Sequence, residues 1–554
     1  WEQIKYTVDI NGEFGNDYVY GQEVTAATFA EKTEGRTNLA CVGWVGTGDV
    51  PASGTANEVS FVQTNDSSIV WNWGDPEQKL YFGGTLTWPK ADEEKYEGCI
   101  ENWIKNGDLS KSEVWSAPEL LAANRLRILA GGTYVIERDV TLAGIDFAAK
   151  AEPVVFDATG RTVTMTDSIN THTKSVVTFK GGTYEMNGQQ FMPENDWASN
   201  CRRDMKIVLD GAVVTNSSRF VLGYCTGTGY NTVCLTNGAV YHQTAKANDN
   251  FWLCYNGVGS NLLHITTGSR LVTSGDLAYA HKGATYPSTV LVEGEGSYLQ
   301  AGSGTDLNET KGCRLIVRDG ASATLSAWWQ VGTDTLVLVS NSTEQTSLGS
   351  PYFYGTNATF RICEAKGYIG ALYPMEAPDK VRNNVIDVVD GDLNVRNIMF
   401  SDQNPFNPES KGDNLTYRLS GTHPKIQYGR NDSNTSANLR PRGKIVYDLP
   451  LAGYDLDETT GEPIVPFYVQ NYCQVDGTCT FEVENLDAIK ADMAEKGQTR
   501  RSWKIFQCSN ITGLSDMLEA SNAKYRGQGV FFTAASGVVS VTVLANSGFF
   551  FRVR

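Results

Sequence analysis

Residues 176–186 read VVTFKGGTYEM, and residues 206–215 read KIVLDGAVVT. Each stretch holds a short β-branched run, a turn that contains glycine, and a second short run. Six other stretches have the same form, and successive copies lie 22 to 30 residues apart, a period of about 27 residues. The turn glycines of the eight copies are Gly132, Gly160, Gly182, Gly211, Gly238, Gly268, Gly296 and Gly320. Weaker copies follow at Asn341, Gly391 and Gly421.

This period predicts a coil of strands. A unit of about 27 residues holds three short strands and has no room for a crossover helix. We therefore expect an all-β chain whose middle winds as a right-handed parallel β-helix, with neighbouring coils about 4.8 Å apart. Glycine supplies left-handed backbone at the turn, and alternate apolar residues, such as Phe179 and Val208, should point inward. The alternative is a β-sandwich with a turn about every 8 to 12 residues, which the longer period disfavours.

The repeat is expected to occupy residues 131–444, because the pattern changes on either side. Residues 1–82 read as a small β-module with glycine-rich turns, and residues 83–130 as a linker with a short capping helix at 116–129. Residues 445–554 combine apolar strands with two helical patterns, at 485–497 and 511–527. They predict a compact β-rich module that also contains helices.

Two resemblances follow from these stretches. Residues 41–51 (CVGWVGTGDVP) and 59–73 (VSFVQTNDSSIVWNW) resemble the InlB B-repeat module of bacterial surface proteins. Trp44, Trp71 and Trp73 are expected to be core residues there rather than ligand contacts. The central repeats resemble pectin-lyase-like β-helices and autotransporter passenger domains, a pattern that many unrelated functions share.

Composition narrows the classes of partner. The 554 residues include 63 acidic and 46 basic side chains, for a formal net charge of −17, which argues against a nucleic-acid partner. No apolar run approaches the roughly 18 residues that a membrane-spanning segment needs. The sequence begins at Trp1 without an initiator methionine or a signal peptide, so we expect a processed form or a segment of a longer protein.

Eleven cysteines without a C-x2-C pair favour disulfides in an oxidising compartment over a zinc site. Cys473 and Cys479 bracket QVDGT, whose Asp-Gly is a turn signal, so a disulfide across a hairpin is expected there. The alternative is a set of reduced, buried thiols that pack as small apolar side chains.

One acidic cluster is the least unfavourable catalytic candidate. Asp387, Asp390 and Asp392 lie in DVVDGDLN, and Arg396 follows. Polysaccharide lyases of the β-helix kind need a calcium-binding acidic cluster and a basic residue that removes a proton. The alternative is a solvated turn, which Gly391 favours. No cofactor is expected otherwise, and His242 and His264 are assigned ordinary positions within the repeats.

We expect an extracellular structural protein of a bacterial cell surface that self-associates head to tail through its terminal β-modules, or that serves as an adhesion scaffold. The apolar segment GFFFRVR (residues 548–554) is the candidate edge strand. A polysaccharide lyase or glycoside hydrolase and a glycan-binding adhesin are the alternatives. Glycan contacts would come from aromatic residues such as Trp252, Tyr255, Trp328 and Trp329, unless these side chains stack inside the coil.

Overall fold

The computed structural model is all-β, with 6% helix. The described residues are 5–10, 17–34, 37–74, 79–81, 99–101, 125–128, 132–136, 139–142, 144–147, 153–171, 174–191, 204–221, 230–243, 251–253, 260–275, 277–278, 287–302, 305–307, 311–353, 355–374, 383–398, 415–429, 438–439, 441–475 and 479–545. They form two compact units: Trp1–Gln189 with Met205–Val213, and Gln190–Asp204 with Val214–Arg554.

The first unit begins with a β-module of two sheets. The larger sheet has the order β2-β1-β8-β5-β4, with β6 on β5, and the smaller sheet pairs β3 with β7. The strands are β1 (Lys5–Ile10), β2 (Asp17–Val19), β3 (Gln22–Ala27), β4 (Glu31–Glu34), β5 (Thr37–Thr47), β6 (Ser53–Gly54), β7 (Glu58–Gln63) and β8 (Ser67–Gly74).

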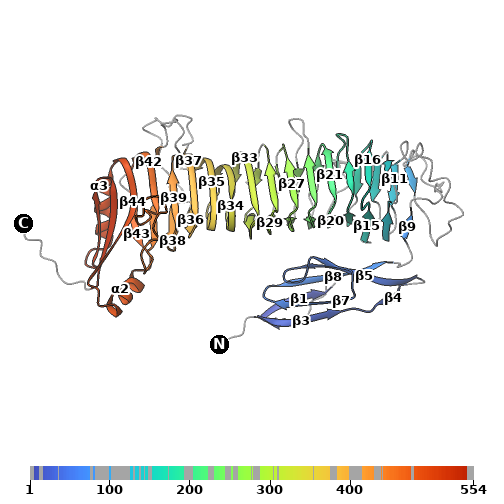
Figure 1. The fold of residues 1–554 in the computed structure, drawn as a ribbon, viewed down its shortest axis with the longest axis horizontal. Helices are drawn as coiled ribbons and strands as arrows, with labels where there is room; N and C mark the ends of the chain where they lie inside the picture. The colour runs from blue at the N-terminus through green and yellow to red at the C-terminus, as the bar shows by residue number, and fades with distance from the viewer. Residues whose placement is uncertain are drawn as a thin grey trace, which may run out of the picture. The chain divides into compact units, whose positions relative to one another are not determined.

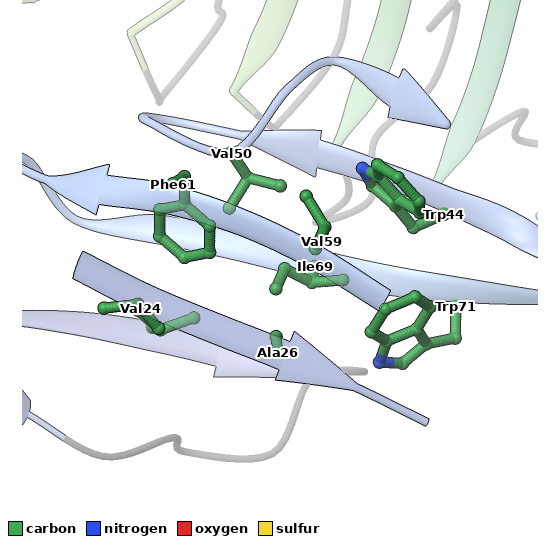
Figure 2. Close-up of a cluster of buried hydrophobic side chains, with 9 residues drawn as sticks. Val24, Ala26, Trp44, Val50, Val59, Phe61, Ile69 and Trp71 are labelled. Atoms are coloured by element: carbon green, nitrogen blue, oxygen red, sulfur yellow. The ribbon is translucent and has the colours of Figure 1, made fainter. Parts of the chain in front are cut away.

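The core of this module lies between the two sheets (Figure 2). Exposed and buried residues alternate along β7, so Val59 and Phe61 face inward, as a strand with one buried face requires. The rings of Trp44 and Trp71 meet edge to face, with centroids 5.9 Å apart. Trp73 packs against the same cluster, which confirms the core role predicted for the three tryptophans.

The rest of the first unit is parallel β-solenoid. Strands of successive coils pair in parallel along three ladders. The first ladder is β9 (Lys79–Tyr81), β12 (Gly132–Val135), β15 (Pro153–Asp157), β18 (Val176–Lys180) and β20 (Met205–Asp210). The second is β13 (Val140–Leu142), β16 (Thr162–Met165) and β19 (Thr183–Glu185). The third is β10 (Cys99–Glu101), β11 (Arg125–Ile128), β14 (Gly144–Phe147) and β17 (Ile169–Thr171).

The second unit has the same architecture, and its successive parallel strands lie side by side from β27 to β39 in Figure 1. Its first ladder is β23 (Asn231–Thr236), β26 (Asn261–Ile265), β29 (Thr289–Glu293), β32 (Arg314–Arg318), β34 (Leu336–Phe353), β35 (Thr359–Pro374), β36 (Val385–Val389), β38 (Thr416–Ser420), β41 (Lys444–Asp448) and β43 (Thr480–Val483). Its other strands up to the last coil are β21 (Val213–Ser217), β22 (Phe220–Val221), β24 (Val240–Gln243), β25 (Phe251–Trp252), β27 (Arg270–Thr273), β28 (Leu277–Ala278), β30 (Tyr298–Ala301), β31 (Thr305–Leu307), β33 (Ser322–Val331), β37 (Asp392–Ile398), β39 (Lys425–Tyr428), β40 (Asn438–Leu439), β42 (Phe467–Gln474) and β44 (Arg500–Thr512). The parallel ladder therefore runs on past residue 444, through β41 and β42. The predicted parallel solenoid of about 27 residues per turn is confirmed.

Apolar side chains fill the interior in register. One column of the first ladder passes through ten consecutive strands, and its members are at most 1% exposed except the last, at 6%. The column is Leu235, Ile265, Val292, Val317, Val339, Ile362, Val388, Leu419, Tyr447 and Val483.

Burial along the strands confirms one predicted inward residue and corrects the other. Phe179 is fully buried, as predicted. The prediction that Val208 points inward is wrong. Strand β20 buries Met205, Ile207 and Leu209, so Val208 lies in the alternate set, which points outward.

Seven of the eight glycines predicted to lie in left-handed turns do so. Gly160, Gly182, Gly211, Gly238, Gly268, Gly296 and Gly320 have φ between 62° and 83°. Gly132 instead begins strand β12. At two weaker copies a polar side chain takes the left-handed position: Asn341 (φ 49°), and Asp390 (φ 45°) in place of Gly391. Asn and Asp tolerate this conformation because their side chains bond locally.

The C-terminal region holds both predicted helices, α2 (Leu486–Glu495) and α3 (Leu514–Lys524). The last strands, β45 (Val530–Ala535) and β46 (Val538–Leu544), turn antiparallel: β46 pairs with both β44 and β45. Residues 548–554, and most of the capping helix predicted at 116–129, lie outside the described residues, while Arg125–Ile128 is strand β11.

Side chains of α3 and of the residue that follows it, Tyr525, bond to the edges of two terminal strands. The Ser521 hydroxyl accepts from the Phe481 N–H of β43 (2.8 Å), and the buried Tyr525 hydroxyl accepts from the Val483 N–H (2.7 Å). The Asn522 amide bonds both backbone groups of Phe532 in β45 (2.8 and 3.0 Å). A terminal strand edge otherwise leaves polar groups open to another chain, so α3 acts as a cap.

The predicted disulfide between Cys473 and Cys479 is wrong in this structure, where both residues are buried thiols. The strands on either side of QVDGT do not form a hairpin. Strand β42 pairs in parallel with β39 and β44, whereas β43 pairs in parallel with β41. Each cysteine therefore belongs to a different ladder.

Candidate functional site

The predicted acidic set is divided between two ladders. Asp387 lies in β36, and Asp392 begins β37. Asp390 lies in the turn between these strands, where its Oδ1 accepts a hydrogen bond from the His423 N–H (2.8 Å). Arg396 lies further along β37. The set does not converge as one calcium-binding and proton-removing centre would require.

Basic side chains surround the two strand aspartates. Asp387 is 5% exposed and is paired in register with Arg361 on one side and Arg418 on the other. Arg361 Nε lies 3.5 Å from its Oδ2. Burial raises the pKa of the Asp387 carboxyl, and the two guanidinium charges partly offset this effect. This geometry favours a structural charge ladder across three coils.

Asp392 lies in the second ladder, in register between Lys366 and Lys425 of the neighbouring coils. Among the described residues, no group of three His, Cys, Asp or Glu side chains is arranged to hold a metal ion.

A second cluster was not predicted, and it lies on the outer face of the first ladder. Cys234 of β23 and His264 of β26 are register partners. His264 Nε2 lies 2.7 Å from Glu293 Oε1 of β29. The other oxygen, Oε2, accepts from Arg318 of β32, at 2.8 Å from Nε and 2.6 Å from Nη2. Thiol, imidazole, carboxylate and guanidinium thus follow one another across four coils.

The cluster holds its imidazole in the charged form. Burial disfavours that charge, but hydrogen bonds with Cys234 and Glu293 outweigh it and raise the pKa of His264 to about 9. The hydrogen bond from His264, with the Arg318 guanidinium, lowers the pKa of the Glu293 carboxyl to about 2 against the effect of burial. At neutral pH an imidazolium therefore lies beside the Cys234 thiol.

Sequence reasoning missed this cluster because its members are 30, 29 and 25 residues apart. The available signal was the period itself: residues one coil apart on an outward position must be neighbours.

Of the aromatic residues considered for glycan binding, Trp329 is 1% exposed, and its Nε1 donates to the Leu348 carbonyl oxygen (2.6 Å). It stacks inside the coil, as the alternative had it. The side chains of Trp252, Tyr255 and Trp328 lie outside the described residues.

The fold places the chain among parallel β-solenoid proteins, the architecture expected from the pectin-lyase-like resemblance. No family model, no curated protein and no solved structure matches the chain. The described helices include none long and apolar enough to cross a bilayer.

Proposed function

We propose that the chain is an extracellular structural protein of a bacterial cell surface, in which the solenoid spaces and displays the modules that flank it. One observation carries the proposal: the interior column from Leu235 to Val483 packs apolar side chains in register through ten strands. Because the described interior is filled, partners would meet the outer face. The strand-by-strand packing suits a stiff support.

Two further observations support this function. The candidate catalytic aspartates Asp387 and Asp392 lie on different ladders, each in register with basic residues of both neighbouring coils. The resemblances of the N-terminal module and the repeats to InlB B-repeats and autotransporter passengers favour the bacterial surface as the location.

Immunogold labelling of producing cells tests the location and the role together. We expect label on intact, unpermeabilised cells and loss of a surface structure when the gene is deleted. Label that appears only after permeabilisation would contradict the proposal. A calcium-dependent rise in absorbance at about 235 nm on uronate polymers would contradict it in favour of a lyase.

Head-to-tail association is part of the proposal. At the C-terminal end, α3 bonds to the edges of β43 and β45, so the contact is assigned to residues 548–554 rather than to these two strands. Light scattering over a concentration series should show growing assemblies, and a variant that lacks residues 548–554 should stay monomeric. A full-length chain that is monomeric at every concentration would contradict this association.

A further inference from the structure

The outer face of the first ladder carries two cysteines in opposite electrostatic surroundings. Cys234 is 8% exposed and lies beside His264, which is hydrogen-bonded to Glu293. Cys363 of β35 is more exposed, and its charged neighbours are Arg361 and three acidic side chains, Glu364, Asp387 and Asp390.

A cation beside a thiol favours the thiolate, which is the nucleophilic form, whereas neighbouring carboxylates disfavour it. Burial raises the pKa of the Cys363 thiol; Arg361 opposes this effect, and the three acidic side chains add to it. At Cys234 the imidazole is itself fixed, since Glu293 Oε1 contacts His264 and Oε2 is held by Arg318. The sequence of thiol, imidazole and orienting carboxylate is the arrangement that activates cysteine nucleophiles.

We propose that Cys234 is a nucleophilic thiol activated by His264, with Glu293 and Arg318 as positioning residues, and that it forms mixed disulfides with low-molecular-weight disulfides. The Cys234 sulfur attacks one sulfur of the small disulfide, and a new S–S bond forms. The original S–S bond breaks, and the departing half leaves as a thiolate that takes a proton from water. One thiol and one disulfide are consumed, and one thiol and one mixed disulfide are produced, so no further oxidant is needed.

The groups that face His264 are known from each strand packed against it: Cys234 from β23 and Glu293 from β29. Arg318 from β32 does not face His264 directly but donates hydrogen bonds to Glu293. Its Nε also lies 3.4 Å from Asp319 Oδ2. Glu293 stays ionised and His264 stays charged between pH 6 and 8, so the activation should be constant in this range.

The test uses the full chain with oxidised glutathione, and in parallel with iodoacetamide, followed by mass spectrometry of each cysteine peptide between pH 6 and 8. The reaction rate of an ordinary thiol falls about tenfold for each unit by which the pH is lowered in this range, because its thiolate fraction falls by that factor. We expect this slope at Cys363, and we expect Cys234 to react at least about tenfold faster than Cys363 at pH 6.5, although Cys363 is the more exposed of the two.

Two variants separate activation from exposure. His264→Gln should lower the rate at Cys234 by at least about tenfold at pH 6.5 and leave the rate at Cys363 unchanged. Glu293→Gln should give a smaller change in the same direction, and it supplies the comparison if the first variant does not fold by circular dichroism. Equal rates at both cysteines of the unmodified chain at pH 6.5 would overturn the proposal, as would a His264→Gln variant with an unchanged rate at Cys234.

Discussion

At the scale of single residues, His264 and Glu293 form a pair whose charges are set by each other. The pKa of His264 is raised from 6.5 to about 9, so its contribution to stability is complete below pH 6.5 and is lost as pH rises through 9. The pKa of Glu293 is lowered from 4.5 to about 2, so its contribution is complete above pH 4.5 and is lost as pH falls through 2. The pair should stabilise the fold most between pH 4.5 and 6.5.

His264→Gln should therefore lower the free energy of unfolding by about 1.5–3 kcal/mol at pH 6, the value of a charged hydrogen bond, and by much less at pH 10. Denaturant unfolding at the two pH values measures this. His423→Gln is the control, because His423 Nδ1 lies 3.7 Å from Asp455 Oδ2 and both side chains are about half exposed. This variant should cost less than about 1 kcal/mol at either pH. An equal loss for His264→Gln at pH 6 and pH 10 would contradict the role of its charge.

Gly54 is a second single-residue determinant, in the N-terminal module. A Cβ at this position would overlap the ring of Trp44, which packs on Trp71. Gly54→Ala should cost about 1–3 kcal/mol through overpacking and should change the near-ultraviolet circular dichroism of the tryptophans. Gly21→Ala is the control: its φ of 80° strains alanine by about 1 kcal/mol, but nothing lies within 4 Å. Equal spectra for the two variants would argue against the contact.

Sequence patterns predicted some of the single-residue features of this structure and not others. The turn at residues 390–391 could be predicted, but the residue that adopts positive φ could not, because Asp390 and Gly391 both tolerate it. Val208 shows the same limit: in a run of consecutive apolar residues, sequence does not say which alternate set faces inward. The cluster at Cys234 depends on contacts between coils, which no local pattern contains.

At the scale of elements, α3 determines how the solenoid ends. The Tyr525 hydroxyl both accepts from and donates to the backbone of Val483 in β43. Tyr525→Phe should leave the Val483 N–H without this partner and cost about 1–3 kcal/mol. Thermal melting measures the loss, and light scattering reports any association through the opened edge. Ser515→Ala, at an exposed site on the same helix, should be nearly neutral; a Tyr525→Phe variant as stable as this control would exclude the cap.

Both C-terminal helices could be predicted, because Asn485 and Gly497 bound the first and its apolar spacing is helical. The lack of a disulfide between Cys473 and Cys479 could not be predicted. The segment QVDGT has the composition of a hairpin turn, but it connects strands of different ladders. Local turn signals do not reveal whether the following strand returns antiparallel or joins the next coil.

At the scale of the whole molecule, each coil contacts mainly its neighbours, so complete coils should be removable. Deletion of residues 296–319 joins two equivalent turns, because Gly320 then takes the place of Gly296. We expect a folded chain with one cooperative melt. Deletion of residues 296–307 removes about half a coil and should abolish cooperative melting, since every later strand would move to the wrong ladder. Equal stability of the two deletions would contradict the coil-by-coil architecture.

The central claim, that successive coils stack in parallel register, is tested most directly by cysteine cross-linking. Thr289 and Arg314 are register partners on neighbouring coils, about 4.8 Å apart, which is within disulfide range. Thr289→Cys with Arg314→Cys should form a disulfide on mild oxidation, identified by mass spectrometry of the linked peptides. Thr289→Cys with Arg318→Cys, four residues further along the strand and about 13 Å out of register, should not. Cross-linking of the second pair in preference to the first would contradict the account.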